Sequence, residues 1–248
     1  MSVSVHLTGF GRFQGVEDNP SCHLARGLAA SAIEALRDPR IHVASSRVVE
    51  VSMAAADAAV AEIFQCVPDD GSHTHVILVH LGVAASAKSF HLEEQAANNC
   101  DFRCPDESGA QPRGQCICRD SALNSFLRTR LPLRAIAARL NEKWQRQAEI
   151  SCDAGLFLCN YIYYRSLQHA SHRTRCHSVF IHVPLHTVTD LQQQADFVCD
   201  FVRCAADQLL AAVETVEAVS SELPAQFSTR EQDSVAVSES KSGLLQPQ

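Results

Sequence analysis

The sequence predicts a single α/β domain, folded as a three-layer α/β/α sandwich around a twisted, mostly parallel, mixed sheet. Short segments with the apolar pattern of strands alternate with longer segments of helical periodicity, and this order of elements builds such a sheet. The chain of 248 residues is 46% hydrophobic and 20% charged, as in a domain with a continuous core. No linker rich in Gly, Ser or Pro interrupts residues 1–221, so we expect one domain there.

The first strand and helix form a β-loop-α unit. Val3 to Leu7 alternates apolar and polar residues and runs into the turn Thr8-Gly9-Phe10-Gly11. Asn19-Pro20-Ser21 predicts a helix start, because Asn or Ser can cap a helix and Pro fits its first turn. Apolar residues then follow at helical spacing, at Leu24, Leu28, Ile33 and Leu36.

The remaining elements continue the alternation. Their apolar patterns predict further strands at residues 41–52, 75–82, 148–151 and 178–183. Helices are predicted at residues 54–64, 134–147, 156–168 and 191–216. From about residue 220 the composition shifts to Ser, Glu, Gln and Pro with few large apolar residues, so 222–248 is predicted to be a disordered tail.

Composition and charge exclude several classes of partner. The net charge is −7 and no Lys/Arg-rich run is present, so nucleic acid is not an expected partner. The start lacks a basic region followed by an apolar stretch, and no window approaches the ~20 apolar residues that span a bilayer. The eleven cysteines cannot all pair within the chain. We therefore expect a cytoplasmic protein with reduced thiols, most of them buried.

Cys159 is the first candidate for chemistry. It follows a predicted strand and a turn at Gly155, close to the start of a helix. A thiol at that place is exposed to the positive end of the helix dipole and to unpaired N–H groups, which lower a thiol pKa and can hold an oxyanion. Taken alone, a cysteine on an apolar helix is more often a core residue.

His182 and Glu93 are candidates for its partners. His182 ends an apolar strand and precedes Pro184, and strand ends of this kind border the ligand crevice of open α/β sheets. Glu93 follows the strand that ends at Gly82, and a carboxylate that accepts the imidazole N–H completes a Cys-His pair. For each residue a structural or surface role is the alternative.

Together these segments resemble pyroglutamyl-peptidase I, a family of cysteine peptidases that remove an amino-terminal pyroglutamate. The resemblance covers about residues 3–215. Its motifs, in the right order, are Thr8-Gly9-Phe10-Gly11-Arg12-Phe13 with Asn19-Pro20-Ser21, the strand end at Gly82, residues 93–112, Asp153-Ala154-Gly155 with Leu158-Cys159-Asn160, and Ile181-His182-Val183-Pro184.

The resemblance implies a role for each matched residue. Cys159 is expected to be the nucleophile, His182 its general base and Glu93 the residue that orients the histidine. Arg103, in a stretch similar to the family's Asp-Ala-Arg-Ile-Pro-Asp, is expected to support the thiolate or the oxyanion. The expected residues around the lactam ring of the substrate are Phe10, Phe13, Asn19 and Val83.

This sequence departs from the family pattern at several positions. Glu94 stands where bacterial members usually carry Arg, and its negative charge near the site is expected to raise the pKa of the nucleophile. Val83 stands where bacterial members tend to have Gln, although vertebrate-like members also have Val. The stretch from Gln111 to Leu131 matches poorly.

Other readings are weighed against the peptidase. One alternative is a zinc site formed by a cluster of cysteines and by histidines farther along the chain, but the spacing of the cysteines fits paired metal ligands poorly. The cysteines are Cys100, Cys104, Cys116 and Cys118, and the histidines are His169, His172 and His177. A catalytically weak or inactive homologue that acts as a binding protein is the main alternative. A nucleoside enzyme that uses phosphate is a third alternative, but this sequence has no glycine-rich phosphate loop of the kind G-x-x-x-x-G-K.

The sequence therefore predicts a thiol peptidase that acts on peptides with an N-terminal pyroglutamate. A thiolate attacks the pyroglutamyl carbonyl, and the resulting thioester is hydrolysed to free pyroglutamate. We expect no metal and no organic cofactor, no nucleic-acid or membrane partner, and leave a homo-oligomer open.

Overall fold

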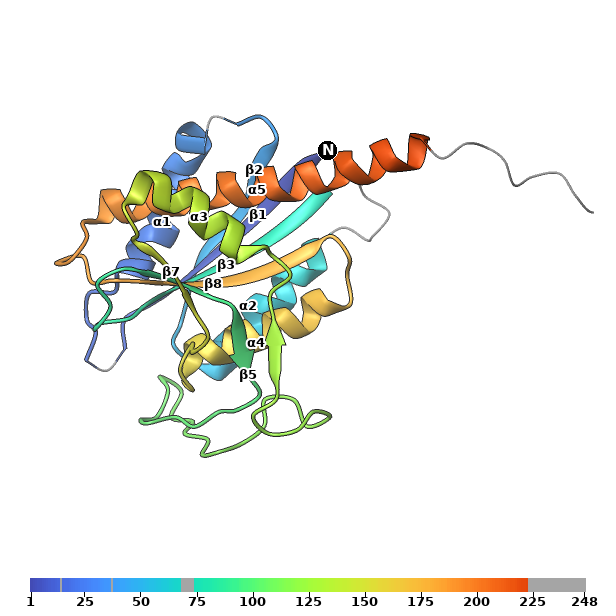
Figure 1. Ribbon diagram of the computed structural model, residues 1–248. Coiled ribbons are helices and arrows are strands. Elements are labelled where there is room, and N and C mark those ends of the chain that lie inside the picture. Colours follow the sequence, from blue (N-terminus) through green and yellow to red (C-terminus); the bar gives the residue numbers. More distant parts are fainter. Residues whose placement is uncertain (14, 37, 68–73, 223–248) are drawn as a thin grey trace, which may run out of the picture.

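The computed structural model describes residues 1–13, 15–36, 38–67 and 74–222. Within these residues a six-stranded sheet has the strand order β2-β1-β3-β8-β4-β7. Its strands are β1 (Ser2–Phe10), β2 (Ile41–Val49), β3 (Thr74–Val83), β4 (Phe90–Glu93), β7 (Ala148–Ser151) and β8 (Cys176–Val183). Neighbouring strands are parallel except β4 and β8, so the predicted mixed, mostly parallel sheet is confirmed. Figure 1 shows β1, β3 and β8 side by side in this sheet.

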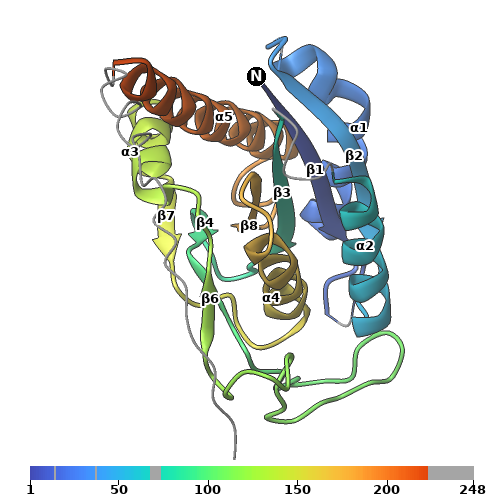
Figure 2. The ribbon, with the colours of Figure 1, turned by 90° about the vertical axis from the view of Figure 1, so that its right-hand side faces the viewer.

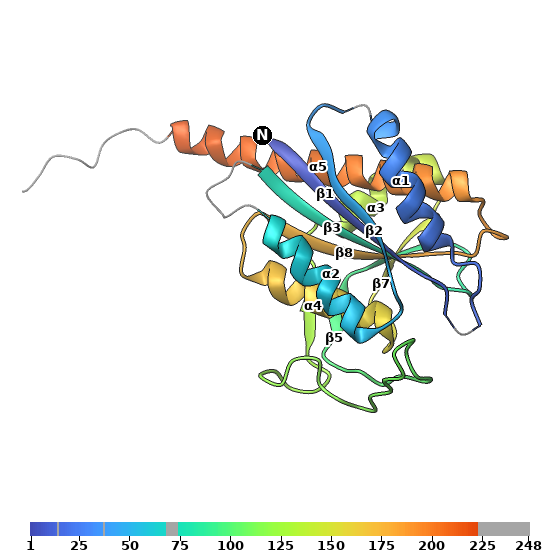
Figure 3. The ribbon, with the colours of Figure 1, turned by 180° about the vertical axis from the view of Figure 1, so that it is seen from behind.

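Helices cover both faces of this sheet (Figures 2 and 3). On one face the core is shared with α1 (Pro20–Leu36), α3 (Leu133–Trp144) and α5 (Leu191–Glu222). On the other face it is shared with α2 (Met53–Cys66) and α4 (Leu158–Ser171). The two apolar clusters, one on each side, make the predicted three-layer α/β/α sandwich.

The burial of the strands follows from their place in the sheet. The central strand β8 is buried along its whole length, and β3 is buried at every residue but its first and last. A strand covered by helices on both faces needs such a continuous apolar run. The edge strand β2 is mostly half-buried or exposed, as its alternating sequence predicts.

The ends of several elements differ from the sequence prediction. β2 ends at Val49, and Ser52 caps α2 by accepting a hydrogen bond from the Ala55 N–H. α3 ends at Trp144 because Gln145 adopts the left-handed conformation, with φ of 48°. α5 continues to Glu222, beyond the predicted end at residue 216, so the disordered tail predicted for 222–248 otherwise lies outside the described residues. The side chains of residues 29–37 and 213–222 are also outside the description, including Ile33 and Leu36.

Three short strands were not predicted. They are β4, β5 (Gln95–Ala97) and β6 (Phe126–Arg128), of which β5 and β6 form a separate antiparallel pair. Segments of three or four residues carry too little periodicity to be recognised, and only their partners define them. The long connection between β5 and β6 is held by Asn98, whose amide donates to three backbone carbonyls and accepts from the Cys118 N–H.

The alternation of side chains along β4 and β8 decides which residues face α4. Phe90 and Leu92 of β4 belong to the core beneath α3 and α5, where Phe90 stacks on Phe197 with ring centroids 3.7 Å apart. Their neighbour Glu93 therefore lies on the opposite face. Phe180 of β8 belongs to the core beneath α4, and His182, two residues farther on, shares its face.

Candidate active site

Glu93 and His182 form a buried pair on the α4 side of the sheet. The two strands that carry them are antiparallel neighbours, with His91 opposite His182 and Glu93 opposite Phe180. His182 Nδ1 lies 2.8 Å from Glu93 Oε1. Glu93 is fully buried and His182 is 8% exposed, so the carboxylate lies beneath the ring and the ring lies nearer the surface.

Cys159 lies in the first turn of α4 and meets the same imidazole. The Gly155 turn, with φ of 76°, leads from β7 into this helix. The Cys159 thiol is hydrogen-bonded to His182, and with Nδ1 engaged by Glu93 the ring nitrogen left for the thiol is Nε2. The N-cap residue Phe157 offers no side-chain cap, so first-turn N–H groups are available beside the sulfur.

Gly82 of β3 leaves the space that the thiol occupies. It is the register partner of His182 on the neighbouring strand. A Cβ at Gly82 would lie 2.6 Å from Phe180 Cζ and 3.1 Å from Cys159 Sγ. The glycine at this strand end is thus a steric requirement, because any side chain would push into the Cys159 thiol and the Phe180 ring.

The charge distribution favours a charged imidazole. Burial opposes the protonated form of His182, but the hydrogen bonds and charges of Cys159 and Glu93 outweigh it and raise the pKa of His182 to about 10. A proton therefore resides on the ring when the sulfur is a thiolate. This arrangement can supply a nucleophile at neutral pH and an acid for the departing group.

The opening loop, described at residues 10–13 and 15–19, lies beside these residues. Phe10 is buried and its ring is 6.5 Å from that of Phe180, whereas Phe13 is half-buried and its ring is 6.3 Å from that of Phe157. Asn19 is buried and braces the loop: its amide donates to the Gly11 carbonyl, and its oxygen accepts from the backbone and hydroxyl of Ser21.

Comparison with known proteins decides the family. Residues 3–220 match the family model described as pyroglutamyl peptidase. The chain belongs to the pyroglutamyl peptidase family. A pyrrolidone-carboxylate peptidase of Deinococcus radiodurans is 34% identical over 194 residues, which are 77% of this chain and 82% of that protein. The one from Pyrococcus furiosus is 31% identical over 183 residues, 73% and 81% of the two chains.

Solved structures of the family agree with the fold. The pyrrolidone carboxyl peptidase from Thermococcus litoralis superposes with a TM-score of 0.72 at 26% identity, covering 84% of this chain and 96% of that one. The Pyrococcus furiosus structure gives a TM-score of 0.70 at 26% identity, covering 83% and 99%. The predicted thiol peptidase of this family is confirmed, and these relatives give no support to the binding-protein alternative.

Val83 and Arg103 are the other residues that the pyroglutamyl-peptidase resemblance singled out. Val83, at the end of β3, is half-buried and pairs in register with Val183, next to His182. Arg103 is exposed on the loop after β5, and among the described residues no hydrogen bond or ion pair joins it to Cys159 or His182. Its loop nevertheless contacts the start of α4: the Asp101 N–H donates to the Leu156 carbonyl, and the Phe102 ring packs edge-on against Phe157.

Glu94, the departure from the family pattern, acts on another thiol. Its carboxylate lies 3.5 Å from Cys152 Sγ and 4.0 Å from Arg134. Desolvation and the hydrogen bond that the thiol donates to Glu94 raise the pKa of Cys152. The alternation at the end of β4 therefore directs Glu93 to the histidine and Glu94 toward the exposed Cys152.

The cysteines are less buried than the sequence led us to expect. All eleven are free thiols, but only Cys100, Cys176, Cys199 and Cys204 are buried, so the expectation that most are core residues was wrong. Five are half-buried because they lie at element ends and on the 98–125 connection, and two are exposed. In the described part of the chain no group of three or more His, Cys, Asp or Glu side chains is arranged to hold a metal ion.

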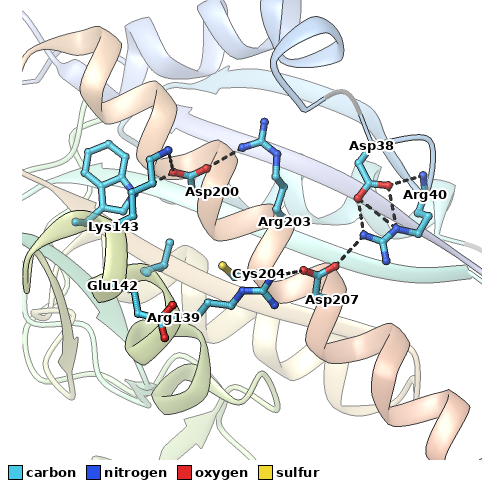
Figure 4. A pocket seen from close by; sticks show the side chains of 11 residues that line it. Asp38, Arg40, Arg139, Glu142, Lys143, Asp200, Arg203, Cys204 and Asp207 are labelled. Carbon is cyan, nitrogen blue, oxygen red and sulfur yellow. Dashed lines mark hydrogen bonds and ion pairs between the residues drawn. The ribbon is translucent and has the colours of Figure 1, made fainter.

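A separate pocket of about 430 Å³ lies between α3 and α5 (Figure 4). Each of three carboxylates in it meets a cationic side chain: Asp38 pairs with Arg40, Asp200 with Lys143 and Arg203, and Asp207 with Arg40 and Arg139. None of the catalytic candidates lines this pocket. The pocket is therefore lined by a network of ion pairs that joins α3, α5 and residues 38–40.

No helix in the described residues has the length and apolar character needed to cross a membrane.

Proposed function

We propose that Cys159 is the nucleophile of this pyroglutamyl peptidase, with His182 as its proton carrier and Glu93 as the residue that holds His182. The observation that carries the proposal is the linked set of contacts from Glu93 Oε1 to His182 Nδ1 and on to the Cys159 thiol. Three segments distant in sequence converge to make it. A carboxylate, an imidazole and a thiol in that order form a catalytic triad.

The reaction begins when the Cys159 thiolate attacks the carbonyl carbon between the pyroglutamyl ring and the next residue. The negative charge that develops on the carbonyl oxygen is held by N–H groups of the first turn of α4. As the C–N bond breaks, protonated His182 gives its proton to the departing amine. The acyl group remains on sulfur as a thioester.

Deacylation uses the same groups in reverse order. Neutral His182 takes a proton from water while the water oxygen attacks the thioester carbonyl. The C–S bond then breaks, pyroglutamate leaves, and the thiolate–imidazolium pair is restored. Glu93 stabilises the positive charge on His182 whenever it forms. The mechanism needs no metal and no organic cofactor.

Recognition of the lactam is assigned to the loop beside the triad. Phe13 and Val83 are half-buried and supply apolar contact, while the buried Phe10 supports Phe180 beneath the site. Asn19 acts by fixing the loop, since its polar atoms are engaged within it. The free thiols are compatible with the proposed cytoplasmic location, and the substrates are peptides that begin with pyroglutamate.

The test is hydrolysis of a pyroglutamyl-arylamide under reducing conditions by the parent chain and three variants. Cys159→Ala and His182→Ala should abolish turnover, and Glu93→Gln should lower kcat by ~10²-fold or more. Cys152→Ala is the matched control, because it removes an exposed thiol outside the triad and should keep full activity. Full activity of Cys159→Ala would refute the proposed nucleophile.

Arg103 is proposed to support the oxyanion or the thiolate once substrate is bound. Arg103→Ala should lower kcat/KM by about 10-fold while the free energy of unfolding stays unchanged, since the side chain is exposed. Arg113→Ala is the control, because Arg113 is an exposed arginine on the same connection whose partner is Asp101. Equal kinetics of the two variants would remove Arg103 from the mechanism.

A further inference from the structure

Tyr163 lies one helical turn after Cys159 on α4 and points to the strand end that carries Glu93. Residues four apart share one face of a helix, so the nucleophile and this tyrosine project toward the same side. The Tyr163 ring is fully buried, and its hydroxyl donates a hydrogen bond of 2.8 Å to the Glu93 main-chain carbonyl. We infer that Tyr163 is a positioning residue that sets the distance between the Cys159 helix and Glu93.

The hydroxyl is the informative part of this side chain. Phenylalanine would fill the same apolar space without placing a polar group in it, so burial alone explains only the ring. Burial and the charge of Glu93 raise the pKa of Tyr163, and the group therefore stays protonated as a donor. Its acceptor is the last residue of β4, where the strand ends and the chain turns toward β5.

A second side chain of α4 fixes the next segment of the same chain. Asn160 is buried, its oxygen accepts from the Ala97 N–H, and its amide donates to the carbonyls of Ala97 and Asn99. Together with Tyr163, it attaches residues 93–99 to the helix of the nucleophile. The helix and the strand end that carries Glu93 then keep one relative position, even though Glu93 and Cys159 are 66 positions apart in the sequence.

The contact between Tyr163 and Glu93 affects catalysis through His182, to which Glu93 is hydrogen-bonded. If the Tyr163 hydroxyl is lost, Glu93 loses its own contact with α4, while Asn160 still holds Ala97 and Asn99. The 2.8 Å bond from Glu93 to His182 is then held less firmly in place. A weaker Glu93 contact stabilises the imidazolium less, so the pKa of His182 falls from its raised value. Because Tyr163 is buried and does not face substrate, the effect belongs to kcat and to the pH profile and leaves KM unchanged.

This inference rests on the roles proposed above for Cys159, His182 and Glu93. The test compares the parent chain with Tyr163→Phe, using kcat, KM and the pH dependence of kcat/KM on a pyroglutamyl-arylamide. We expect a fall in kcat of about 10-fold, within the ~10²-fold loss that a displacement of 1 Å can cause, with KM unchanged. The alkaline limb of the pH profile should move to lower pH.

Ser166→Ala is the matched control. Ser166 is a fully buried residue of the same helix, and its hydroxyl lies 2.8 Å from the Ser178 hydroxyl on β8. Its loss removes a buried contact between α4 and the sheet that involves no member of the triad. Urea unfolding of both variants shows whether their stabilities are comparable, and Ser166→Ala should keep the parent pH profile.

The outcomes separate the two proposals. If Tyr163→Phe and Ser166→Ala have the same kcat and the same alkaline limb, Tyr163 only contributes to stability and the inference is overturned. If the parent is active and Glu93→Gln retains full activity, Glu93 has no role for Tyr163 to support, and the inference fails with the proposed triad. If Tyr163→Phe alone loses kcat and shifts the limb while KM is unchanged, the positioning role holds.

Discussion

The space at Gly82 gives the sharpest prediction about this site. In Gly82→Ala the new methyl group would lie 2.6 Å from Phe180 Cζ, 3.0 Å from its Cε1 and 3.1 Å from Cys159 Sγ. Carbon atoms in ordinary contact are about 3.5–4.0 Å apart, so roughly 1 Å of overlap must be relieved. Phe180 is fully buried, with its ring centroid 4.7 Å from that of His182, and movement of the Phe180 ring is therefore transmitted to His182.

The expected losses follow from this geometry. Overpacking of a buried site costs about 1–3 kcal/mol of unfolding free energy. A displacement of about 1 Å between the thiol and its partners costs ~10²-fold in kcat/KM. Steady-state hydrolysis of a pyroglutamyl-arylamide measures the change in kcat/KM, and urea titration measures the change in unfolding free energy. Gly82 does not have a positive φ, so alanine at this position brings no backbone strain, and the losses can be attributed to the new methyl group.

Gly27→Ala is the control for the same chemical change. A Cβ at Gly27, on α1, meets no atom within 4 Å. Alanine there should raise stability by about 0.5–1 kcal/mol, because glycine is unfavourable inside a helix, and kcat/KM should not change. Full kcat/KM in Gly82→Ala, with stability equal to that of the parent, would refute the conclusion that Gly82 leaves the space for the Cys159 thiol and the Phe180 ring.

Further predictions concern titration and the opening loop. The pKa of His182 is raised from 6.5 to about 10, so His182 keeps its proton through neutral pH. We therefore expect kcat/KM to fall only as the pH rises through about 10. A pH-rate profile with an alkaline limb below pH 8 would contradict this expectation. Burial lowers the pKa of His80 from 6.5 to about 3, so below pH 6.5 the unfolded chain binds a proton that the native state does not, and stability falls toward acid by up to about 1.4 kcal/mol per pH unit from this group. Urea unfolding at pH 7 and pH 5 should show a smaller difference in His80→Asn than in the parent. Asn19→Ala removes the three hydrogen bonds of a buried amide, and should cost about 1–3 kcal/mol in urea unfolding and raise KM by loosening the loop; an unchanged KM would separate this loop from substrate binding.

The sequence was sufficient where periodicity or turn chemistry was strong. The first strand and helix were predicted from the alternation before Gly9 and from Asn19-Pro20-Ser21, and both are present. The short strands β4 to β6 were missed because three or four residues define a strand only through their partners. The antiparallel pairing of β4 with β8, which brings Glu93 to His182, was therefore not predictable from local pattern.

The residues of the proposed triad were selected from the sequence in two unequal steps. Local sequence gave Cys159 near a helix start and His182 at a strand end, and the structure has both in those places. Their pairing with Glu93 came from the family resemblance, since no local pattern distinguishes Glu93 from Glu94. Tyr163 was missed because a tyrosine in an apolar helix has the pattern of an ordinary core residue, and only the tertiary structure shows the acceptor of its hydroxyl.

The reversed direction of β4 also decides what can reach Glu93 from solution. In register with Phe180, the carboxylate lies on the α4 side of the sheet, beneath the ring of His182, and is fully buried. A water-soluble carbodiimide should therefore label the exposed carboxylates of the native protein and leave Glu93 unlabelled. Mass spectrometry of this one side chain would then report opening of the β4–β8 pairing, so Glu93 is an internal probe of local unfolding at the candidate active site.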